Sequence, residues 1–214
     1  QAVSDIDEFY LGHRFDKRGR LYSDGYLLNY QADEWCKAAI SPCIKAEKLT
    51  KEGWRQMDID LANHCGLDKA NYDVRVKAVK ESYDTTSVNN GKVKKPLLAR
   101  KNLNAREEAI ANDYISDYVV GVDATASGMQ ILAILANCSE TAKLTNLTDI
   151  STCYDIYGEA CQKILEHTKS DLEISDIRDI VKKALMTRGY NSRKQVEDAL
   201  DELFLKGIKL TLQK

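Results

Sequence analysis

The sequence predicts an α+β fold that is predominantly helical and carries a small amount of β structure. Apolar residues recur at helical spacing through most of the chain, which indicates amphipathic helices. Aromatic and aliphatic residues alternate loosely over residues 9–30, with Gly19 at the expected turn, which predicts a β-hairpin. The β-branched run DYVVGVD, residues 117–123, predicts a short buried strand that leads into a core helix.

The expected helices follow the hairpin in order. Residues 50–62 have apolar positions at helical spacing, with Thr50 placed to cap the helix and Gly66 to close it. The segment 85–96 is polar, contains a glycine and ends in proline, which predicts a loop. The other helices are expected over residues 34–46, 71–83, 97–113, 127–138, 153–167 and 195–207, and over a segment carrying residues 178–190 that Asp176 or Ser175 would cap.

The composition limits the classes of protein. The chain has 214 residues, of which 43% are hydrophobic and 30% charged, and it has no long apolar run, so a membrane protein is not expected. Its six cysteines form no CxxC pair, which argues against a zinc site and favours reduced thiols. We expect a cytoplasmic protein, and a virion or an organelle is also compatible with this composition.

The charge and the ends of the chain are also informative. The net charge of −2 provides no global basic field, so any nucleic-acid contact must come from local basic patches such as residues 97–106 and 178–194. The chain starts at Gln1 rather than Met and stops at Lys214 in a charged stretch, so we expect a piece of a longer protein.

A stripe of side chains stands out on one predicted helix. Arg178, Lys182, Met186 and Tyr190 follow one another at steps of four residues, which places them near one helix face. Two cations followed by an aromatic ring match a triphosphate followed by a base. The alternative is an ordinary solvated basic face.

The aspartate at the end of the predicted strand has two interpretations, a metal ligand and a helix cap. Asp123 is followed by ATASG, and its carboxylate together with the Ala124 carbonyl supplies two oxygen ligands of the kind that a hard divalent cation prefers. Alternatively, Asp123 caps a helix that begins at Ser127.

Both motifs resemble those of one polymerase family. Residues 123–130, DATASGMQ, resemble motif A of the single-subunit DNA-dependent RNA polymerases of phage and mitochondrial type, and residues 178–190, RDIVKKALMTRGY, resemble their motif B. Residues 9–23 resemble the DxxGR element, residues 52–69 the helix after it, and residues 154–164 the helix between motifs A and B. The five segments occur in the family's order.

The resemblance implies the palm and fingers region of a right-hand polymerase, with a small palm sheet. It implies a β-hairpin with the DxxGR element over residues 1–31 and a helical palm-associated region over 32–112. The palm with motif A would cover residues 113–168, and the fingers with motif B would cover residues 169–214.

The resemblance also implies roles for individual residues. Asp123 and Ala124 would bind Mg²⁺, with Asp123, Lys182 and Tyr190 as the catalytic residues. The substrate-binding residues would be Arg178 and Lys182 at the phosphates and Met186, Tyr190 and Gly128 around the nucleotide. The contacts to template or RNA:DNA hybrid would come from Arg18, Arg20, Tyr157, Asn191 and Ser192.

One position favours RNA synthesis. Related DNA-synthesising polymerases carry a glutamate five residues after the motif A aspartate, where its bulk excludes a 2′-hydroxyl, whereas this sequence has Gly128. Met186 rather than an aromatic residue follows the motif B lysine by four, as in the RNA polymerases. The resemblance therefore implies nucleotidyl transfer from NTPs to an RNA 3′ end on a DNA template, by a two-metal mechanism.

No motif C, the source of the second metal-binding aspartate, follows in this sequence. Asp201 and Glu202 are alternatives to it, although their amphipathic context favours a solvated face. We therefore expect the chain by itself to be inactive and to need a further C-terminal segment or a second polypeptide, with an accessory DNA-melting protein as another partner. The competing hypotheses are a non-catalytic nucleic-acid-binding or assembly subunit of a polymerase and a family A-like DNA polymerase.

Overall fold

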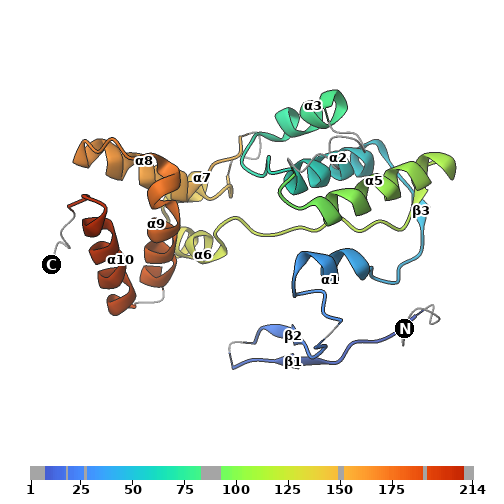
Figure 1. Ribbon diagram of the computed structural model, residues 1–214, viewed down its shortest axis with the longest axis horizontal. Helices are drawn as coiled ribbons and strands as arrows, with labels where there is room; N and C mark the ends of the chain where they lie inside the picture. The colour runs from blue at the N-terminus through green and yellow to red at the C-terminus, as the bar shows by residue number, and fades with distance from the viewer. Residues whose placement is uncertain are drawn as a thin grey trace. The chain divides into compact units, whose positions relative to one another are not determined.

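The computed structural model describes residues 8–17, 19–26, 28–82, 93–148, 152–189 and 192–209. The chain forms two compact units, residues 1–122 and residues 123–214, and each is considered by itself. The predicted fold class is confirmed: the described residues are predominantly helical, with two small antiparallel two-stranded sheets (Figure 1). The division into four segments stays a prediction.

The predicted hairpin is present near the start of the first unit. Strand β1 (His13–Phe15) pairs antiparallel with β2 (Leu21–Ser23), and His13 lies opposite Ser23. Gly19 takes a φ of 76° in the connecting turn, a conformation that glycine adopts without steric cost. The backbone N–H of Arg20 donates to the Asp16 carboxylate at 2.9 Å, which closes the turn.

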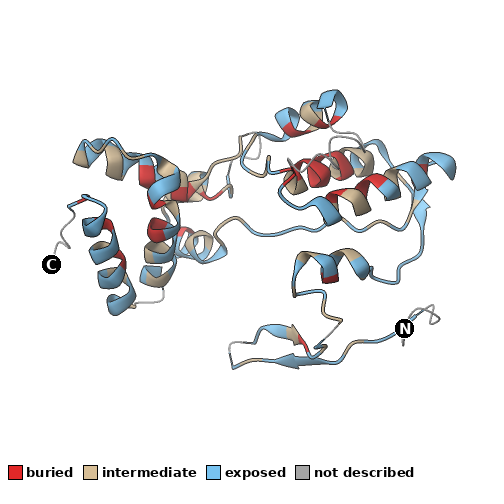
Figure 2. Ribbon diagram, in the orientation of Figure 1, coloured by how far each residue is buried: buried red, intermediate tan, exposed pale blue. Residues whose placement is uncertain are grey.

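Three helices build the core of the first unit: α2 (Lys51–His64), α3 (Tyr72–Ser82) and α5 (Pro96–Ala111). The Thr50 hydroxyl accepts a 3.0 Å hydrogen bond from Gly53 N–H, so the predicted cap of α2 is confirmed. Residues 85–92 of the predicted loop lie outside the described residues, and Pro96 begins α5. The buried faces of these helices meet, as Figure 2 shows, in a cluster of Leu61, Ala62, Cys65, Val79, Val93, Ala99 and Leu103.

Helix α1 (Glu34–Ala39) is shorter than the predicted 34–46, because proline disfavours a helical conformation in the residue before it and Pro42 follows closely. Its two ends are tied to α5. The Glu34 carboxylate accepts the N–H groups of Leu97 and Leu98, at 2.6 and 3.1 Å, at the start of α5. At the other end of α1, the Lys101 ammonium of α5 donates a 2.6 Å hydrogen bond to the carbonyl of Ile40, the residue after the helix. These bonds satisfy helix-terminal groups that would otherwise lack partners.

The predicted buried strand over residues 117–123 is wrong. The second sheet instead pairs β3 (Glu47–Lys48) with β4 (Ile115–Ser116), and residues 117–123 join no ladder in the described part of the chain. Val119 and Val122 are 44% and 92% exposed. A β-branched run forms a strand only where a neighbouring strand can pair with it. The second sheet uses the residues immediately before this run, and its assignment as a palm sheet stays a prediction.

The regular elements in the described residues of the second unit are all helices. It contains α6 (Ser127–Leu135), α7 (Ser139–Leu144), α8 (Ile156–Thr168), α9 (Ile174–Gly189) and α10 (Arg193–Leu205). Helix α6 ends earlier than predicted, and α7 was not predicted. Asn137 lies between them with a φ of 48°, a left-handed conformation that asparagine tolerates better than most residues.

Helices α8, α9 and α10 pack around one apolar cluster. Gly207 takes a φ of 87° after α10, so the predicted end of this helix is confirmed to within two residues. No helix in the described residues is long and apolar enough to cross a membrane. The cluster consists of Cys161, Ile177, Ile180, Val181, Ala199, Leu203 and Ile208.

Candidate nucleotide site

The basic stripe of the sequence lies on α9. This helix begins at Ile174, so Ser175 and Asp176 are inside its first turn rather than at its cap. Asp176 nevertheless contributes, because its carboxylate accepts a 2.9 Å hydrogen bond from the backbone N–H of Glu173. The buried face of α9 carries Ile177, Ile180 and Val181, so the stripe stands to one side of the buried face.

Arg178 and Lys182 converge on one aromatic ring. The guanidinium carbon of Arg178 lies 5.9 Å from the centre of the Tyr157 ring, and the ammonium of Lys182 lies 5.8 Å from it. Tyr157 is on α8 and is 9% exposed. A cation near an aromatic face is attracted by the ring quadrupole, which favours this arrangement. The structure therefore brings together three of the residues to which the sequence assigned substrate and template contacts.

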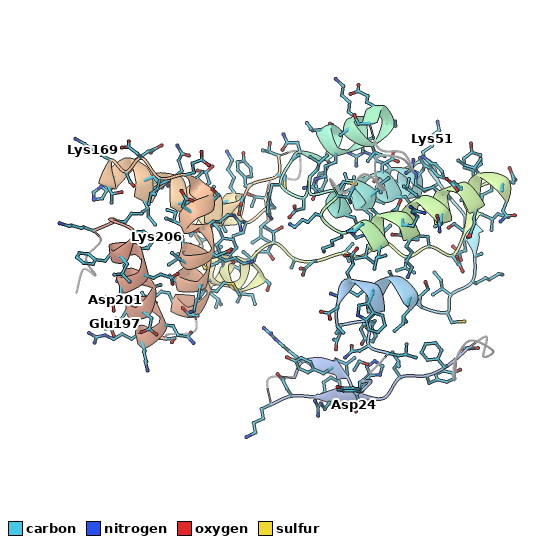
Figure 3. All side chains as sticks on the ribbon, viewed as in Figure 1. Asp24, Lys51, Lys169, Glu197, Asp201 and Lys206 are labelled. Atoms are coloured by element: carbon cyan, nitrogen blue, oxygen red, sulfur yellow. The ribbon has the colours of Figure 1, made fainter. Side chains whose placement is uncertain are left out.

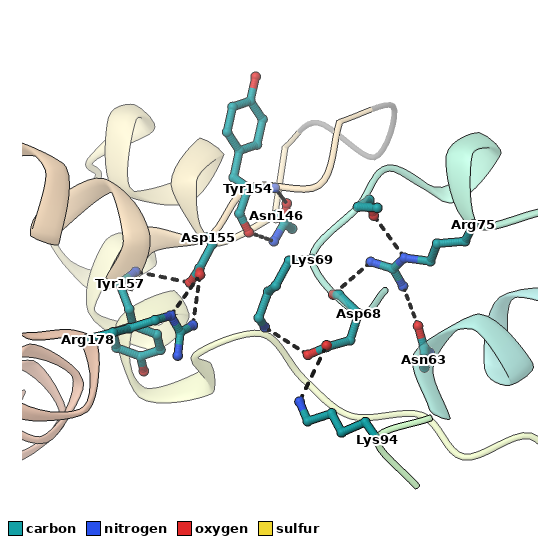
Figure 4. A network of polar contacts seen from close by, with 11 residues as sticks. Asn63, Asp68, Lys69, Arg75, Lys94, Asn146, Tyr154, Asp155, Tyr157 and Arg178 are labelled. Carbon is teal, nitrogen blue, oxygen red and sulfur yellow. Dashed lines mark hydrogen bonds and ion pairs between the residues drawn. The ribbon is translucent and has the colours of Figure 1, made fainter. Parts of the chain in front are cut away.

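Asp155 is a member of this cluster that sequence reasoning missed. Its Oδ2 accepts hydrogen bonds from Nη2 of Arg178 at 2.8 Å and from Nε at 3.3 Å (Figure 4). The hydrogen bonds that Arg178 donates to Asp155 raise the pKa of Arg178, while burial opposes this shift and the charge of the carboxylate adds to it. An available signal was the position of this aspartate directly before the helical run IYGEACQKI, where aspartate is a favoured cap.

The segment before α8 is held by two hydrogen bonds between the Asn146 side chain and the backbone of Tyr154, which we call the Asn146 clamp. Asn146 accepts a 2.7 Å hydrogen bond from the Tyr154 N–H and donates a 2.9 Å bond to the Tyr154 carbonyl (Figure 4). Asn146 has a φ of 60°, which orients its amide for both bonds at some conformational cost. The clamp fixes the residue that precedes Asp155, and thereby the first turn of α8.

The structure describes only some of the other site residues that the resemblance to motif B implies. Met186 is on α9 and is 44% exposed. Ser192 precedes α10, and its N–H donates to the Thr187 carbonyl at 3.0 Å. Tyr190 and Asn191 lie outside the described residues, so the assignments to them stay predictions.

Asp123 and Gly128 belong to the start of the second unit. Asp123 and Ala124 are exposed, and the Asp123 carboxylate forms no hydrogen bond or ion pair within the described part of the chain. The residue that caps α6 is Ala126, with a φ of 53° and no side-chain capping bond, so the alternative that Asp123 caps this helix is wrong. Gly128 is exposed in the first turn of α6.

Helix α6 is joined to α7 by a side chain from the segment that resembles motif A. The Gln130 amide donates a 2.7 Å hydrogen bond to the carbonyl of Thr145, and Thr145 is fully buried at the end of α7. The hydroxyl of Thr145 in turn donates to the Thr141 carbonyl at 2.8 Å. Gln130 thus has a structural function that joins α6 to α7.

The carboxylates suit a divalent cation only in part. Asp123 and the Ala124 carbonyl present oxygen ligands to solvent, and Mg²⁺ is commonly held by one or two carboxylates together with substrate phosphates and water. The described residues contain no group of three or more His, Cys, Asp or Glu side chains that could hold a metal ion. Asp201 and Glu202, the alternatives to a motif C aspartate, are exposed on α10. Figure 3 labels Asp201 on this helix.

The nucleic-acid contacts expected of the hairpin are only partly described. Arg20 is exposed at the end of the turn between β1 and β2, with its backbone held by Asp16. Arg18 lies outside the described residues. The role of Arg20 therefore stays a prediction.

Comparisons with known proteins agree with the resemblance. A family model described as DNA-dependent RNA polymerase matches residues 47–211. A probable DNA-directed RNA polymerase of Neurospora crassa is 29% identical over 213 residues, which cover 90% of this chain and 23% of that protein. A probable DNA-directed RNA polymerase of Agaricus bitorquis is 30% identical over 210 residues, covering 86% of this chain and 19% of that protein.

A mitochondrial polymerase is also similar to this chain. The mitochondrial DNA-directed RNA polymerase of Schizosaccharomyces pombe is 25% identical over 226 residues, covering 92% of this chain and 20% of that protein. The chain therefore spans about a fifth to a quarter of the length of these relatives. Because the family model matches most of its residues, the chain belongs to the DNA-dependent RNA polymerase family, of the single-subunit phage and mitochondrial type.

Proposed function

We propose that this chain is the nucleotide-holding and metal-holding part of a DNA-directed RNA polymerase. The reaction is nucleotidyl transfer from NTPs to the 3′ end of RNA on a DNA template. The observation that carries the proposal is the convergence of Arg178 and Lys182 on Tyr157, because it places two cations beside an aromatic ring on adjacent helices. This is the arrangement that a triphosphate and a base require together.

Each part of the site has a defined task in this proposal. Arg178 and Lys182 bind the phosphates of the incoming nucleotide. Tyr157 lies near the templating base, and Met186 and Tyr190 border the nucleotide. The chain positions the reactants rather than forming a covalent intermediate with them, since the attacking hydroxyl belongs to the RNA.

Asp123 and the Ala124 carbonyl would hold the catalytic Mg²⁺ in this proposal. The bound magnesium would supply positive charge that favours ionisation of the attacking hydroxyl and neutralisation of the departing pyrophosphate. The exposed, unpaired carboxylate of Asp123 supports the assignment within the described residues. A second carboxylate, from a further segment or a partner polypeptide that carries motif C, would complete the site.

The first experiment replaces Asp123 by alanine in the complete, RNA-synthesising assembly that contains this chain. We expect RNA synthesis to fall by about 10³-fold or more, as for the loss of a central electrostatic contribution. Asp171→Ala is the matched control, because Asp171 is an exposed aspartate of the same unit outside the site. Unchanged RNA synthesis by the Asp123→Ala variant would favour the alternative that this chain is a non-catalytic subunit of a polymerase.

A second experiment distinguishes ribonucleotide from deoxyribonucleotide synthesis. A glutamate at position 128 would occupy the space beside the ribose 2′-hydroxyl, so Gly128→Glu should reduce incorporation of NTPs far more than that of dNTPs. The ratio of kcat/KM for the two substrates measures this effect. A wild-type preference for dNTPs, left unchanged by the substitution, would favour the DNA polymerase instead.

The partners follow from the same proposal. They are a DNA template, the RNA product, NTPs and the polypeptide segment that carries motif C. An accessory protein that melts DNA is a further proposed partner, and the location of the protein in the cell stays a prediction.

A further inference from the structure

Asp155 divides its two carboxylate oxygens between two neighbours in the candidate nucleotide site. Oδ1 accepts a 3.3 Å hydrogen bond from the backbone N–H of Tyr157, and Oδ2 accepts the bonds from Arg178. We propose that Asp155 is the positioning residue for nucleotide binding, which holds Arg178 by one edge and directs its other edge toward the triphosphate. This inference rests on the proposed function and names a residue that the motifs do not include.

The geometry of the guanidinium supports this role. An arginine side chain has five N–H donors in a planar fork, and the bonds to Asp155 use only Nε and Nη2. Nη1 makes no hydrogen bond to any residue in the described ranges. A phosphate can therefore bind at this second edge while the first remains on the carboxylate, and a fork held in advance loses less rotamer freedom on binding.

The surroundings favour a persistent ion pair. The side chains of Asp155 and Arg178 are each 25% exposed, so water screens their attraction less than at an open surface. Lys182 has no carboxylate partner within the described part of the chain, so its charge is left for the substrate. Asp155 thus orients Arg178 and leaves the charge of Lys182 unneutralised.

Gly158 provides the space that this carboxylate occupies. A Cβ atom at position 158 would lie 3.2 Å from Oδ2 of Asp155, which is tighter than nine in ten Cβ contacts. An alanine there would press on the oxygen that holds Arg178, while its helix propensity exceeds that of glycine. Gly158→Ala therefore perturbs the positioning of Arg178 without an expected loss of helix stability.

The principal test is Asp155→Asn in the complete RNA-synthesising assembly. Asparagine keeps the shape and the capping oxygen but loses the charge that orients Arg178. We expect KM for NTPs to rise about tenfold, corresponding to one charge-assisted hydrogen bond, with kcat changed by less than about twofold. A fall in KM would overturn the proposal, because it would mean that Asp155 competes with the triphosphate for Arg178.

A double-mutant cycle tests whether Asp155 acts through Arg178. Arg178→Gln alone should raise KM, and adding Asp155→Asn should then change KM by less than about twofold. Independent, multiplying effects would overturn the inference. Should Arg178→Gln raise KM while Asp155→Asn does not, the inference fails and the proposed function stands; no effect of Arg178→Gln on KM would overturn both.

Two further variants separate positioning from structure. Gly158→Ala should raise KM without lowering the melting temperature, and a lower melting temperature with unchanged KM would count against the role. Glu197→Gln is the matched control, because it removes an exposed carboxylate that lies 2.8 Å from Arg193 on α10 (Figure 3). We expect it to leave KM unchanged, and an equal rise in KM would indicate a nonspecific effect of charge and overturn the proposal.

Discussion

The hydroxyl of Tyr118 donates a 2.6 Å hydrogen bond to Oδ2 of Asp60, a carboxylate that is 3% exposed on α2. Asn102 on α5 donates to the same oxygen at 3.1 Å, and His64 lies 3.3 Å from it. One buried oxygen therefore connects α2, α5 and the segment after β4. Since a buried charge is stable only with such partners, this network should contribute to the stability of the first unit.

The network predicts how stability depends on pH. Burial by itself would raise the pKa of Asp60, but hydrogen bonds from His64, Tyr118 and Asn102 and the attraction of His64 together lower it below the ordinary value of 3.8. A lowered folded-state pKa contributes stability at pH values above the unfolded pKa, and this is lost as pH falls through the folded pKa.

We therefore expect Asp60→Asn to cost about 1–3 kcal/mol of unfolding free energy at pH 7. The difference from the wild type should begin to shrink as pH falls below about 3.9, where the carboxyl is protonated in the unfolded state first, and should continue to shrink down to the folded pKa. Urea denaturation at several pH values measures this difference in unfolding free energy. Asp73→Asn, which changes an exposed carboxylate, is the control; a difference for Asp60→Asn that stays constant down to pH 2 would contradict this account.

A second buried ion pair predicts a larger effect. Arg106 pairs with Asp58, which is 1% exposed, and its guanidinium carbon also lies 4.7 Å from the centre of the Trp54 ring. Arg106→Ala would leave a buried carboxylate without its cation, so we expect a loss of about 3–5 kcal/mol in denaturant unfolding.

The exposed pair between Lys48 and Asp113 provides the control for this prediction. Its side chains are 65% and 78% exposed, so Asp113→Asn should change stability by less than about 1 kcal/mol. Equal losses in the two variants would show that burial does not determine the strength of these pairs.

Lys182 and Lys183 offer a comparison of neighbouring lysines on one helix. Only Lys182 lies near the Tyr157 ring, and both lysines are exposed. Lys182→Ala should raise KM for NTPs by about tenfold or more, since it removes a phosphate contact, and Lys182→Arg should restore part of the affinity. Lys183→Ala should have little effect. Similar changes in KM for both alanine variants would indicate a general electrostatic field instead of a specific contact.

The thiols should differ in reactivity. A hydrogen bond with the Thr141 hydroxyl lowers the pKa of Cys138, whereas burial raises the pKa of Cys65 to about 11 and also raises that of Cys161. Because the thiolate is the reactive form, iodoacetamide at pH 8 should modify Cys138 first and should leave Cys65 and Cys161 unmodified until the protein unfolds.

Mass spectrometry of time points would measure this order. Cys43 is the internal comparison, because it is an exposed cysteine. Faster modification of Cys43 than of Cys138 would mean that the contact with Thr141 does not activate the thiol. Cys138→Ser should remove the fastest phase.

The sequence by itself determined the helical character of the chain and the family to which it belongs. Periodicity located most helices, since burial of one face requires apolar residues at helical spacing. Thr50 and Gly19 were identified as cap and turn because local backbone chemistry alone limits which residues suit those positions. The helical spacing of Arg178 and Lys182 likewise placed them on one helix, while their roles stay predictions.

Only the tertiary structure decided which residues meet. Asp155 and Arg178 are separated by 23 positions, and no local pattern predicts that the cap of one helix pairs with a cation of the next. The β-branched run at 117–123 was misassigned because strand formation depends on a partner strand, which in this chain pairs with Ile115 and Ser116 instead. Helix propensity and capping are properties of neighbouring residues, whereas ion pairs and strand pairing depend on how distant segments pack, and that is why the positioning of Arg178 became visible only in the folded chain.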